Sequence, residues 1–412
     1  MKSGRFSLVR PAVATILTLI AAVTTAQRLD RFAYRYDRFN FSSFYNWGDE
    51  YNRGEPVWAS VRPRRKLQFT AEYFCNYTPF FVETFSPLSR LDEKTAHTVW
   101  QLTQVAVLVA ALLLLARTAE PRLDWPEGVA FAAIGVTFQS VRNLLWGSQW
   151  SPVLLLLLIL SWRSSRRERP YVAGFWLAAA TLLKLYPGML GGYFALRRRW
   201  REVVSSAVLF LLGVIGSGPR HWMEFWRYGT PHSFARIASP IMALDLSAIL
   251  PNVYRVVADS SGHPYSASWP LVLALTIPLD LIVVAVLVFA TLRDRDDGRG
   301  LVFSMWLAAA VLLSPLAWRN ELILLFPAYL FSYQVAIATL DRHPRYVSAV
   351  VIGFVTACVL GEFSRKWSRV EPAILFPLIL FAACAVLLGR HAESRELGVE
   401  TMKELKRASQ GR

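Results

Sequence analysis

The sequence predicts an all-α protein that crosses a membrane many times, and two observations support this prediction. First, 54% of the 412 residues are hydrophobic, 18% are charged and the mean hydropathy is +0.34, whereas soluble chains carry about 25% charged residues. Second, apolar runs recur from one end of the chain to the other. Because a bilayer makes the backbone satisfy its own hydrogen bonds, we expect these runs to be helices.

The apolar runs number twelve, and we expect them to form one polytopic domain over residues 1–390, followed by a basic tail over 391–412. Several are shorter than the roughly 20 residues that cross a bilayer unaided, which tilted or broken helices tolerate. We interpret the first run as an uncleaved span, with a cleaved signal peptide as the alternative. The runs lie at residues 8–26, 97–116, 127–141, 152–162, 171–184, 187–196, 203–217, 268–292, 300–316, 322–340, 347–361 and 373–389.

The charge pattern predicts the orientation of the chain. A net charge of +16 would suggest nucleic acid in a soluble protein. Here the arginines gather in short loops such as 163–169 and 197–201, as in cytoplasmic loops of membrane proteins. We therefore interpret them as topology signals and contacts to membrane lipids, and expect no nucleic-acid partner. An even number of spans places both termini in the cytoplasm of a multi-pass protein of the cell inner (plasma) membrane, with extracytoplasmic loops at 27–95 and 218–267.

The first extracytoplasmic loop holds candidate acids and aromatic side chains. Asp37 and Asp49 are candidate bases, because a carboxylate can take the proton from an attacking hydroxyl; each could instead pair with a neighbouring arginine. Tyr45 and Trp47 belong to a dense aromatic tract. Such rings stack on sugar faces or anchor a loop among lipid headgroups.

Lys184 ends an apolar run just before Pro187. A lysine at this depth either snorkels to the membrane surface or faces inward and holds a phosphate. Since proline breaks a helix, the turn would also expose backbone donors to the same anion. Gln149, between two apolar runs, is either part of a simple turn or a hydrogen-bond donor at the rim of a cavity.

A second polar interruption, residues 314–321, contains four consecutive candidate site residues: Trp318, Arg319, Asn320 and Glu321. A guanidinium suits a phosphate, so Arg319 is a candidate phosphate ligand; the alternative is a capped turn with an internal Arg–Glu pair. Common zinc-protease, nucleotide-binding and serine-nucleophile motifs are not found in the sequence. We therefore expect no metal and no cofactor.

Four motifs in order give the chain a resemblance to the polytopic glycosyltransferases of family 87, over roughly residues 10–390. The resemblance implies the C-type membrane glycosyltransferase architecture, with short helices in the periplasmic loops, and a polyprenyl-phosphate sugar as donor, commonly of mannose or arabinose. It adds Tyr77, in the second motif, to the substrate-binding candidates. The motifs are residues 40–58, 76–91, 147–201 and 314–318.

The resemblance implies that Lys184 and Arg319 hold the phosphate, helped by Gln149, while a first-loop carboxylate deprotonates a lipid or glycan acceptor and the sugar is transferred with inversion. One departure matters: the family's opening aspartate, its general base, aligns with Asn40. An amide cannot accept the proton, so either Asp37 or Asp49 has taken the role, the alignment slips, or activity is altered or lost. The alternatives are a flippase of lipid-linked saccharides and a catalytically inactive member.

Overall fold

The chain is helical throughout the part that its structure, a computed structural model, describes, and that part contains no β-strand. This confirms the all-α class. The twelve-segment count and the C-type architecture stay predictions. The described residues are 39–59, 75–118, 128, 131, 149–231, 248–260, 267–294, 300–315, 317–339, 378–379 and 381–386.

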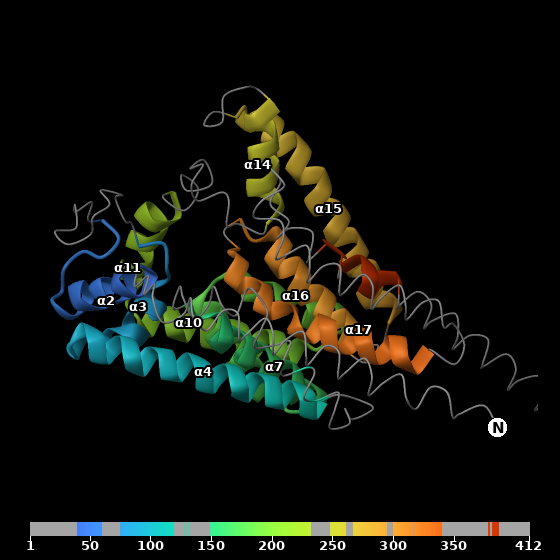
Figure 1. The fold of residues 1–412 in the computed structure, drawn as a ribbon, viewed down its shortest axis with the longest axis horizontal. Helices are drawn as coiled ribbons and strands as arrows, with labels where there is room; N and C mark the ends of the chain where they lie inside the picture. Colours follow the sequence, from blue (N-terminus) through green and yellow to red (C-terminus); the bar gives the residue numbers. More distant parts are fainter. Residues whose placement is uncertain are drawn as a thin grey trace, which may run out of the picture.

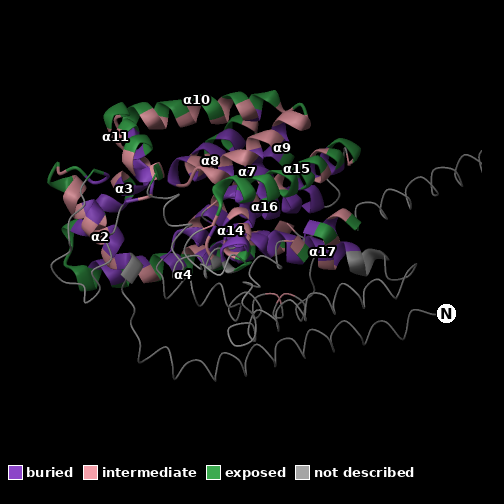
Figure 2. Cartoon of the chain, turned by 90° about the horizontal axis from the view of Figure 1, so that it is seen from above, coloured by how far each residue is buried: buried purple, intermediate pink, exposed green. Residues whose placement is uncertain are grey.

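Among the described residues, two helices are long and apolar enough to cross a membrane: α4 (Glu93–Thr118) and α15 (Trp269–Arg293). A third would be α10 (Trp200–Gly216) taken together with residues Pro219–Gly229, although the two halves are bent by 97°. All three helices leave large apolar side chains exposed, and Figure 2 shows exposed positions along the surfaces of α10 and α15. Since water disfavours such surfaces and lipid does not, the chain is a membrane protein.

Four helices pack side by side to form one wall of the molecule (Figure 1). The helix α4 packs on α7 (Ser151–Arg166), α7 on α8 (Pro170–Leu183), and α8 on α10. Short connections make sequential helices antiparallel neighbours. The helix α8 therefore runs from one arginine-rich loop toward the opposite end of the wall.

The two arginine-rich loops share one backbone geometry. Each has a charged residue in the left-handed region, Glu168 and Arg198, both with φ 57°. The N–H of the next residue, Arg169 or Arg199, donates to a helix carbonyl five positions earlier, at 3.0 and 2.9 Å. This hydrogen bond closes a helix C-terminus, where glycine is the usual left-handed residue.

A fully buried helix, α16 (Leu301–Leu313), lies behind this wall. Its residues from 301 to 312 are all buried and appear so in Figure 2, as expected for a helix that is apolar on every side. It contacts α15, α17 (Phe326–Thr339) and α9 (Leu190–Leu196). Another helix, α14 (Ile249–Ser260), pairs with α15 and projects with it from the body in Figure 1.

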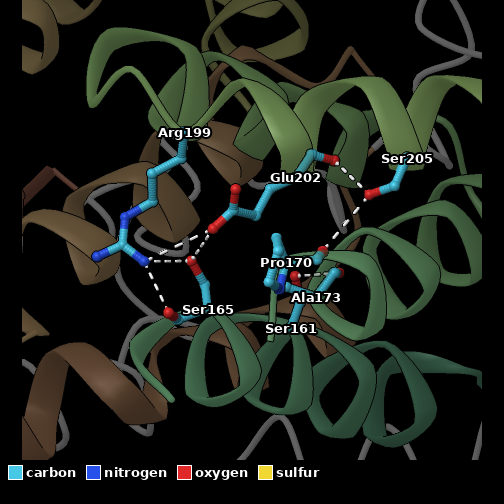
Figure 3. Close-up of polar contacts among 7 residues, drawn as sticks. All are labelled: Ser161, Ser165, Pro170, Ala173, Arg199, Glu202 and Ser205. Carbon is cyan, nitrogen blue, oxygen red and sulfur yellow. Dashed lines mark hydrogen bonds and ion pairs between the residues drawn. The ribbon is translucent and has the colours of Figure 1, made fainter. Parts of the chain in front are cut away.

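Buried polar contacts join α7 to the start of α10 (Figure 3). The guanidinium of Arg199 donates to the carbonyl oxygen of Ser165 at 2.7 Å and to its hydroxyl at 2.6 Å. That hydroxyl donates to the buried carboxylate of Glu202 at 2.9 Å. Because the buried Ser165 and Glu202 side chains are partners of each other, these contacts fix the arginine-rich ends of α7 and α10 relative to one another.

Short helices gather at the opposite end of the wall (Figure 1). They are α2 (Phe39–Asn52), α3 (Pro79–Phe85), the 3₁₀ turn η1 (Ser86–Arg90) and α11 (Pro219–Glu224). These helices belong to the ranges 27–95 and 218–267 that the sequence assigned to extracytoplasmic loops. The side of the membrane on which they lie stays a prediction.

A close approach of α8 and α10 generates a test of the packing. A Cβ on Gly174 would lie 2.8 Å from the backbone nitrogen of Ser206 and 2.9 Å from the carbonyl oxygen of Glu202. We expect Gly174→Ala to lower the melting temperature of the purified protein, because backbone atoms cannot yield cheaply; overpacking of this kind costs about 1–3 kcal/mol.

The matched control is Gly191→Ala in α9, where a Cβ meets nothing within 4 Å. This change should leave the melting temperature unchanged or raise it, because alanine favours helix over glycine by about 1 kcal/mol. Equal melting temperatures for the two variants would contradict the close packing of α8 on α10.

Candidate functional site

A break in the wall of helices positions Lys184. The helix α8 ends at Leu183, and Lys184 is extended at φ −153° and ψ 131°. A short 3₁₀ turn, η2 (Tyr186–Met189), follows and contains Pro187. The predicted interruption at residues 184–188 is thereby confirmed. Since α8 begins at an arginine-rich loop, Lys184 lies at the other end of the wall.

The end of α8 is tied to the segment before α3. The hydroxyl of Thr78 donates to the carbonyl oxygen of Leu182 and also accepts the N–H of Phe81 at 3.3 Å, which caps α3. One threonine therefore satisfies a free carbonyl of one helix and a free N–H of another. This places Tyr77, the residue before Thr78, beside Lys184.

Lys184 forms an ion pair with Glu321, a residue of the 3₁₀ helix η5 (Arg319–Leu325). The side chain of Lys184 is 21% exposed, whereas that of Glu321 is 0% exposed. The ammonium also lies 5.7 Å from the ring centroid of Tyr77 and 5.5 Å from that of Tyr186. A cation is thus held by a buried acid and two aromatic faces, with part of its side chain still accessible.

Hydrogen bonds hold the surrounding segments in place. The hydroxyl of Tyr77 donates to the side-chain oxygen of Gln149 at 2.8 Å. The amide of Asn320 donates to the hydroxyl of Ser151 at 2.9 Å. Gln149 and Asn320 are both buried, so they support the walls of the site. Trp318 precedes η5 and is partly exposed.

Two buried polar atoms at this site lack a hydrogen-bond partner among the described residues: the Oε2 atom of Glu321 and the hydroxyl of Tyr186. Leaving such atoms unpaired costs about 1–3 kcal/mol each, and more for a charged group. Buried polar atoms without a protein partner are typical of sites that bind a polar ligand or water. The site therefore combines a partly exposed lysine side chain with unsatisfied polar groups.

The aromatic residues of α2 pack as a core behind Tyr77. The Trp47 ring is buried and lies 5.8 Å from that of Tyr77, and the Phe44 ring lies 5.0 Å from it. Tyr45 is directed elsewhere, because its hydroxyl donates to the carbonyl oxygen of Leu91 at 2.7 Å. These contacts make Trp47 a support for Tyr77, and Tyr45 a tie between α2 and the segment before α4.

The structure does not bring Asp49 to Lys184. The carboxylate of Asp49 is 43% exposed and forms an ion pair with Arg53 at 3.1 Å. Asp49 comes two positions after the buried Trp47, a rotation of about 200° around the helix axis, so it faces away from Tyr77. Asp37 lies outside the described residues, and Asn40 occupies the first turn of α2. Arg319 begins η5, but only its backbone is described.

A second group of ionisable residues was not singled out from the sequence. His221 of α11 lies between the rings of Tyr51 and Trp58, with centroid distances of 5.4 and 5.8 Å. Burial raises the pKa of the nearby Glu83 carboxyl, and attraction to His221 lowers that pKa by a smaller amount. The sequence places Glu83 and His221 in the two predicted extracytoplasmic loops, 27–95 and 218–267. Their spacing in the sequence does not indicate that they lie close together.

Residues 74–315 match the family model of glycosyltransferase family 87. The match covers more than half of the chain. The chain belongs to this family. Within the matched range lie Tyr77, Gln149 and Lys184, whereas Asn40, Asp49 and Glu321 lie outside it.

Curated relatives are mycobacterial family members. The chain is 26% identical over 273 residues to a polyprenol-phosphate-mannose-dependent alpha-(1-2)-phosphatidylinositol pentamannoside mannosyltransferase of Mycolicibacterium smegmatis, covering 66% of the chain and 62% of the relative. It thus spans less than two thirds of that protein. It is 22% identical over 351 residues to a polyprenol-phosphate-mannose-dependent alpha-(1-2)-phosphatidylinositol mannoside mannosyltransferase of Mycobacterium tuberculosis, covering 78% and 76%. No solved structure matches.

The ion pair between Lys184 and Glu321 generates a test of the site in this family 87 protein. Lys184→Met leaves the carboxylate of Glu321 buried without its cation, and breaking one side of a buried pair typically costs about 3–5 kcal/mol. We expect this variant to melt well below the unchanged protein in detergent. The double variant Lys184→Met with Glu321→Gln should recover most of the loss, because no unpaired charge remains. A double variant as unstable as the single one would show that the two side chains are not coupled.

Proposed function

We propose that the chain is an integral membrane glycosyltransferase that moves a hexose or pentose, mannose first among them, from a polyprenyl-phosphate sugar to a lipid or glycan acceptor. Membership of family 87 supports this reaction class. The relatives' names, which specify polyprenol-phosphate-mannose as donor and phosphatidylinositol mannosides as acceptors, support the choice of sugar and acceptor class.

The observation that carries the proposal is the Lys184 side chain, which is 21% exposed and lies at the break after α8. A polyprenyl-phosphate sugar is an amphiphile whose only charge is its phosphate. Lys184 lies at the end of an apolar helix, so the lipid tail can remain among apolar side chains while the phosphate meets the cation. The two tyrosine rings beside Lys184 offer faces on which a sugar can stack.

In the reaction we propose, the acceptor hydroxyl attacks the anomeric carbon and the bond from that carbon to the phosphate oxygen breaks. A carboxylate takes the hydroxyl proton, and the phosphate leaves with both bonding electrons. Lys184 stabilises the charge that develops on the phosphate, which is the electrostatic part of catalysis. A single displacement inverts the anomeric centre. We propose that the reaction takes place on the extracytoplasmic face of the inner membrane.

The direct test is release of polyprenyl phosphate by the purified protein incubated with a polyprenyl-phosphate mannose and phosphatidylinositol mannosides. Lys184→Ala should raise the KM for the donor at least tenfold, because it removes the cation that meets the phosphate. An unchanged KM and kcat would make Lys184 a structural partner of Glu321 with no role in binding the donor.

The same assay separates the alternatives. The resemblance aligns the family's usual aspartate with Asn40, and that alignment supports a catalytically inactive member that still binds the donor as the alternative. Donor binding without release of polyprenyl phosphate, with any acceptor, would support that reading and overturn the proposed reaction. Passage of labelled lipid across liposomes without release would instead indicate a flippase.

The geometry of α2 generates a separate prediction about the base. Asp49 is exposed and paired with Arg53, so we expect Asp49→Asn to change kcat by less than threefold. We expect Asp37→Asn to lower kcat about 100-fold or more, as removal of a general base does. Single-turnover rates at saturating donor would measure both. Two fully active variants would remove the proposed base from the first loop.

A further inference from the structure

We propose that Glu321 is a positioning residue that makes the site favour the phosphodiester donor over the phosphomonoester product, by neutralising Lys184 from the buried side. This inference deepens the proposed function and rests on it. Glu321 would thereby assist release of polyprenyl phosphate after sugar transfer.

The geometry places Glu321 behind Lys184 rather than beside the ligand. Its side chain is 0% exposed, whereas 21% of the Lys184 side chain is accessible. In the proposal, a phosphate approaches along the exposed part of the Lys184 side chain and does not displace the buried carboxylate. Glu321 acts on the ligand through Lys184 and through the charge that it adds to the site.

Glu321 is unsuited to the role of base. In a single displacement, the attacking hydroxyl and the leaving phosphate lie on opposite faces of the anomeric carbon. A carboxylate that contacts the cation holding the phosphate lies on the leaving-group side. A base must lie within hydrogen-bond reach of the attacking hydroxyl on the other side. The position of Glu321 is that of a counter-ion.

The two ligands differ in charge, and the difference arises from the reaction itself. The donor is a phosphodiester with one negative charge. When the bond from the anomeric carbon to oxygen breaks, that oxygen stays on the phosphate, which becomes a monoester with a charge of about −1.5 to −2 at pH 7. A fixed negative charge behind Lys184 opposes the monoester more strongly than the diester.

The surroundings of Glu321 allow that charge to act at short range. Its Oε1 atom faces Lys184, and its Oε2 atom has no hydrogen-bond partner in the part of the chain that the structure describes. Burial lowers the local dielectric and strengthens the repulsion. The paired side chains carry no net charge, so they attract the dianionic monoester less than an isolated lysine would. The singly charged diester still gains the hydrogen bonds of the ammonium.

The test compares the binding of two ligands to the full-length protein in nanodiscs, and it needs no turnover. The ligands are a short-chain polyprenyl phosphate and the polyprenyl-phosphate mannose with the same lipid chain. We expect Glu321→Gln to tighten the Kd of the monoester at least tenfold and that of the diester less than threefold. Glu321→Asp keeps the charge and should preserve the ratio of the unchanged protein.

A second readout is product inhibition. In Glu321→Gln, the inhibition constant of polyprenyl phosphate should fall at least tenfold relative to the donor KM. Equal changes in the affinity for both ligands, or a ratio that does not move, would overturn the role of Glu321 while leaving the proposed function intact. If the unchanged protein binds neither ligand, the proposed function fails, and the inference fails with it.

The comparison of Glu321→Gln with Glu321→Asp guards against a purely structural effect. A variant that has lost its packing loses affinity for both ligands together, whereas the proposal requires a gain for one of them. If Glu321→Gln does not fold, the proposal is tested with Glu321→Asp alone. This variant must retain the ratio of the monoester Kd to the diester Kd that the unchanged protein has, and a changed ratio would overturn the proposal.

Discussion

The buried ion pair between Lys184 and Glu321 constrains the structure more than any other contact described. A charge within an apolar helical body is tolerated only when a partner of opposite charge and suitable geometry is present. The end of α8 at Leu183 meets this requirement, because the extended Lys184 that follows it pairs with η5. The requirement also fixes η5 itself, since Glu321 has to enter the protein interior beside α16.

The short helices at this end of the molecule support that pair in layers. Thr78 holds α3 to the last turn of α8, and Tyr77 thereby faces the ammonium. Behind Tyr77 lie Phe44 and Trp47, which bring α2 into the same core. Aromatic residues that seem suited to sugar contact in the sequence therefore divide into two kinds. The Tyr77 ring contacts the cation, and the α2 rings form its backing.

Local signals in the sequence were sufficient for the helix break after α8, because a proline such as Pro187 removes a helical hydrogen bond and kinks or breaks a helix. They also identified Lys184, Gln149 and Glu321, and the family resemblance added Tyr77; the structure brings these four residues together. The partner of Glu321 was beyond such reasoning. The alternative interpretation of residues 314–321 paired Glu321 with a neighbouring arginine, whereas the actual partner is 137 residues away. Pairing across that distance depends on how α7, α8 and α16 pack, which no short pattern encodes.

Helical rotation explains why Asp49 could not be placed from sequence. In an unstructured loop, every acid near Trp47 is free to approach the same ligand. Once residues 39–52 form a helix, Trp47 and Asp49 face opposite sides, and the ion pair with Arg53 holds the carboxylate on the exposed side. The position of a residue around the axis of α2 therefore decides whether its side chain faces Tyr77 or solvent.

The left-handed residues Glu168 and Arg198 have a consequence for protein engineering. Glycine at either position would relax the backbone, and a search for thermostable variants would favour it. At position 198 the same exchange would delete a cation from a stretch of four arginines, of the kind that directs a nascent chain during insertion. At position 198, thermal stability therefore favours glycine, whereas correct membrane insertion favours arginine. Position 168 carries no cation, so no such conflict arises there.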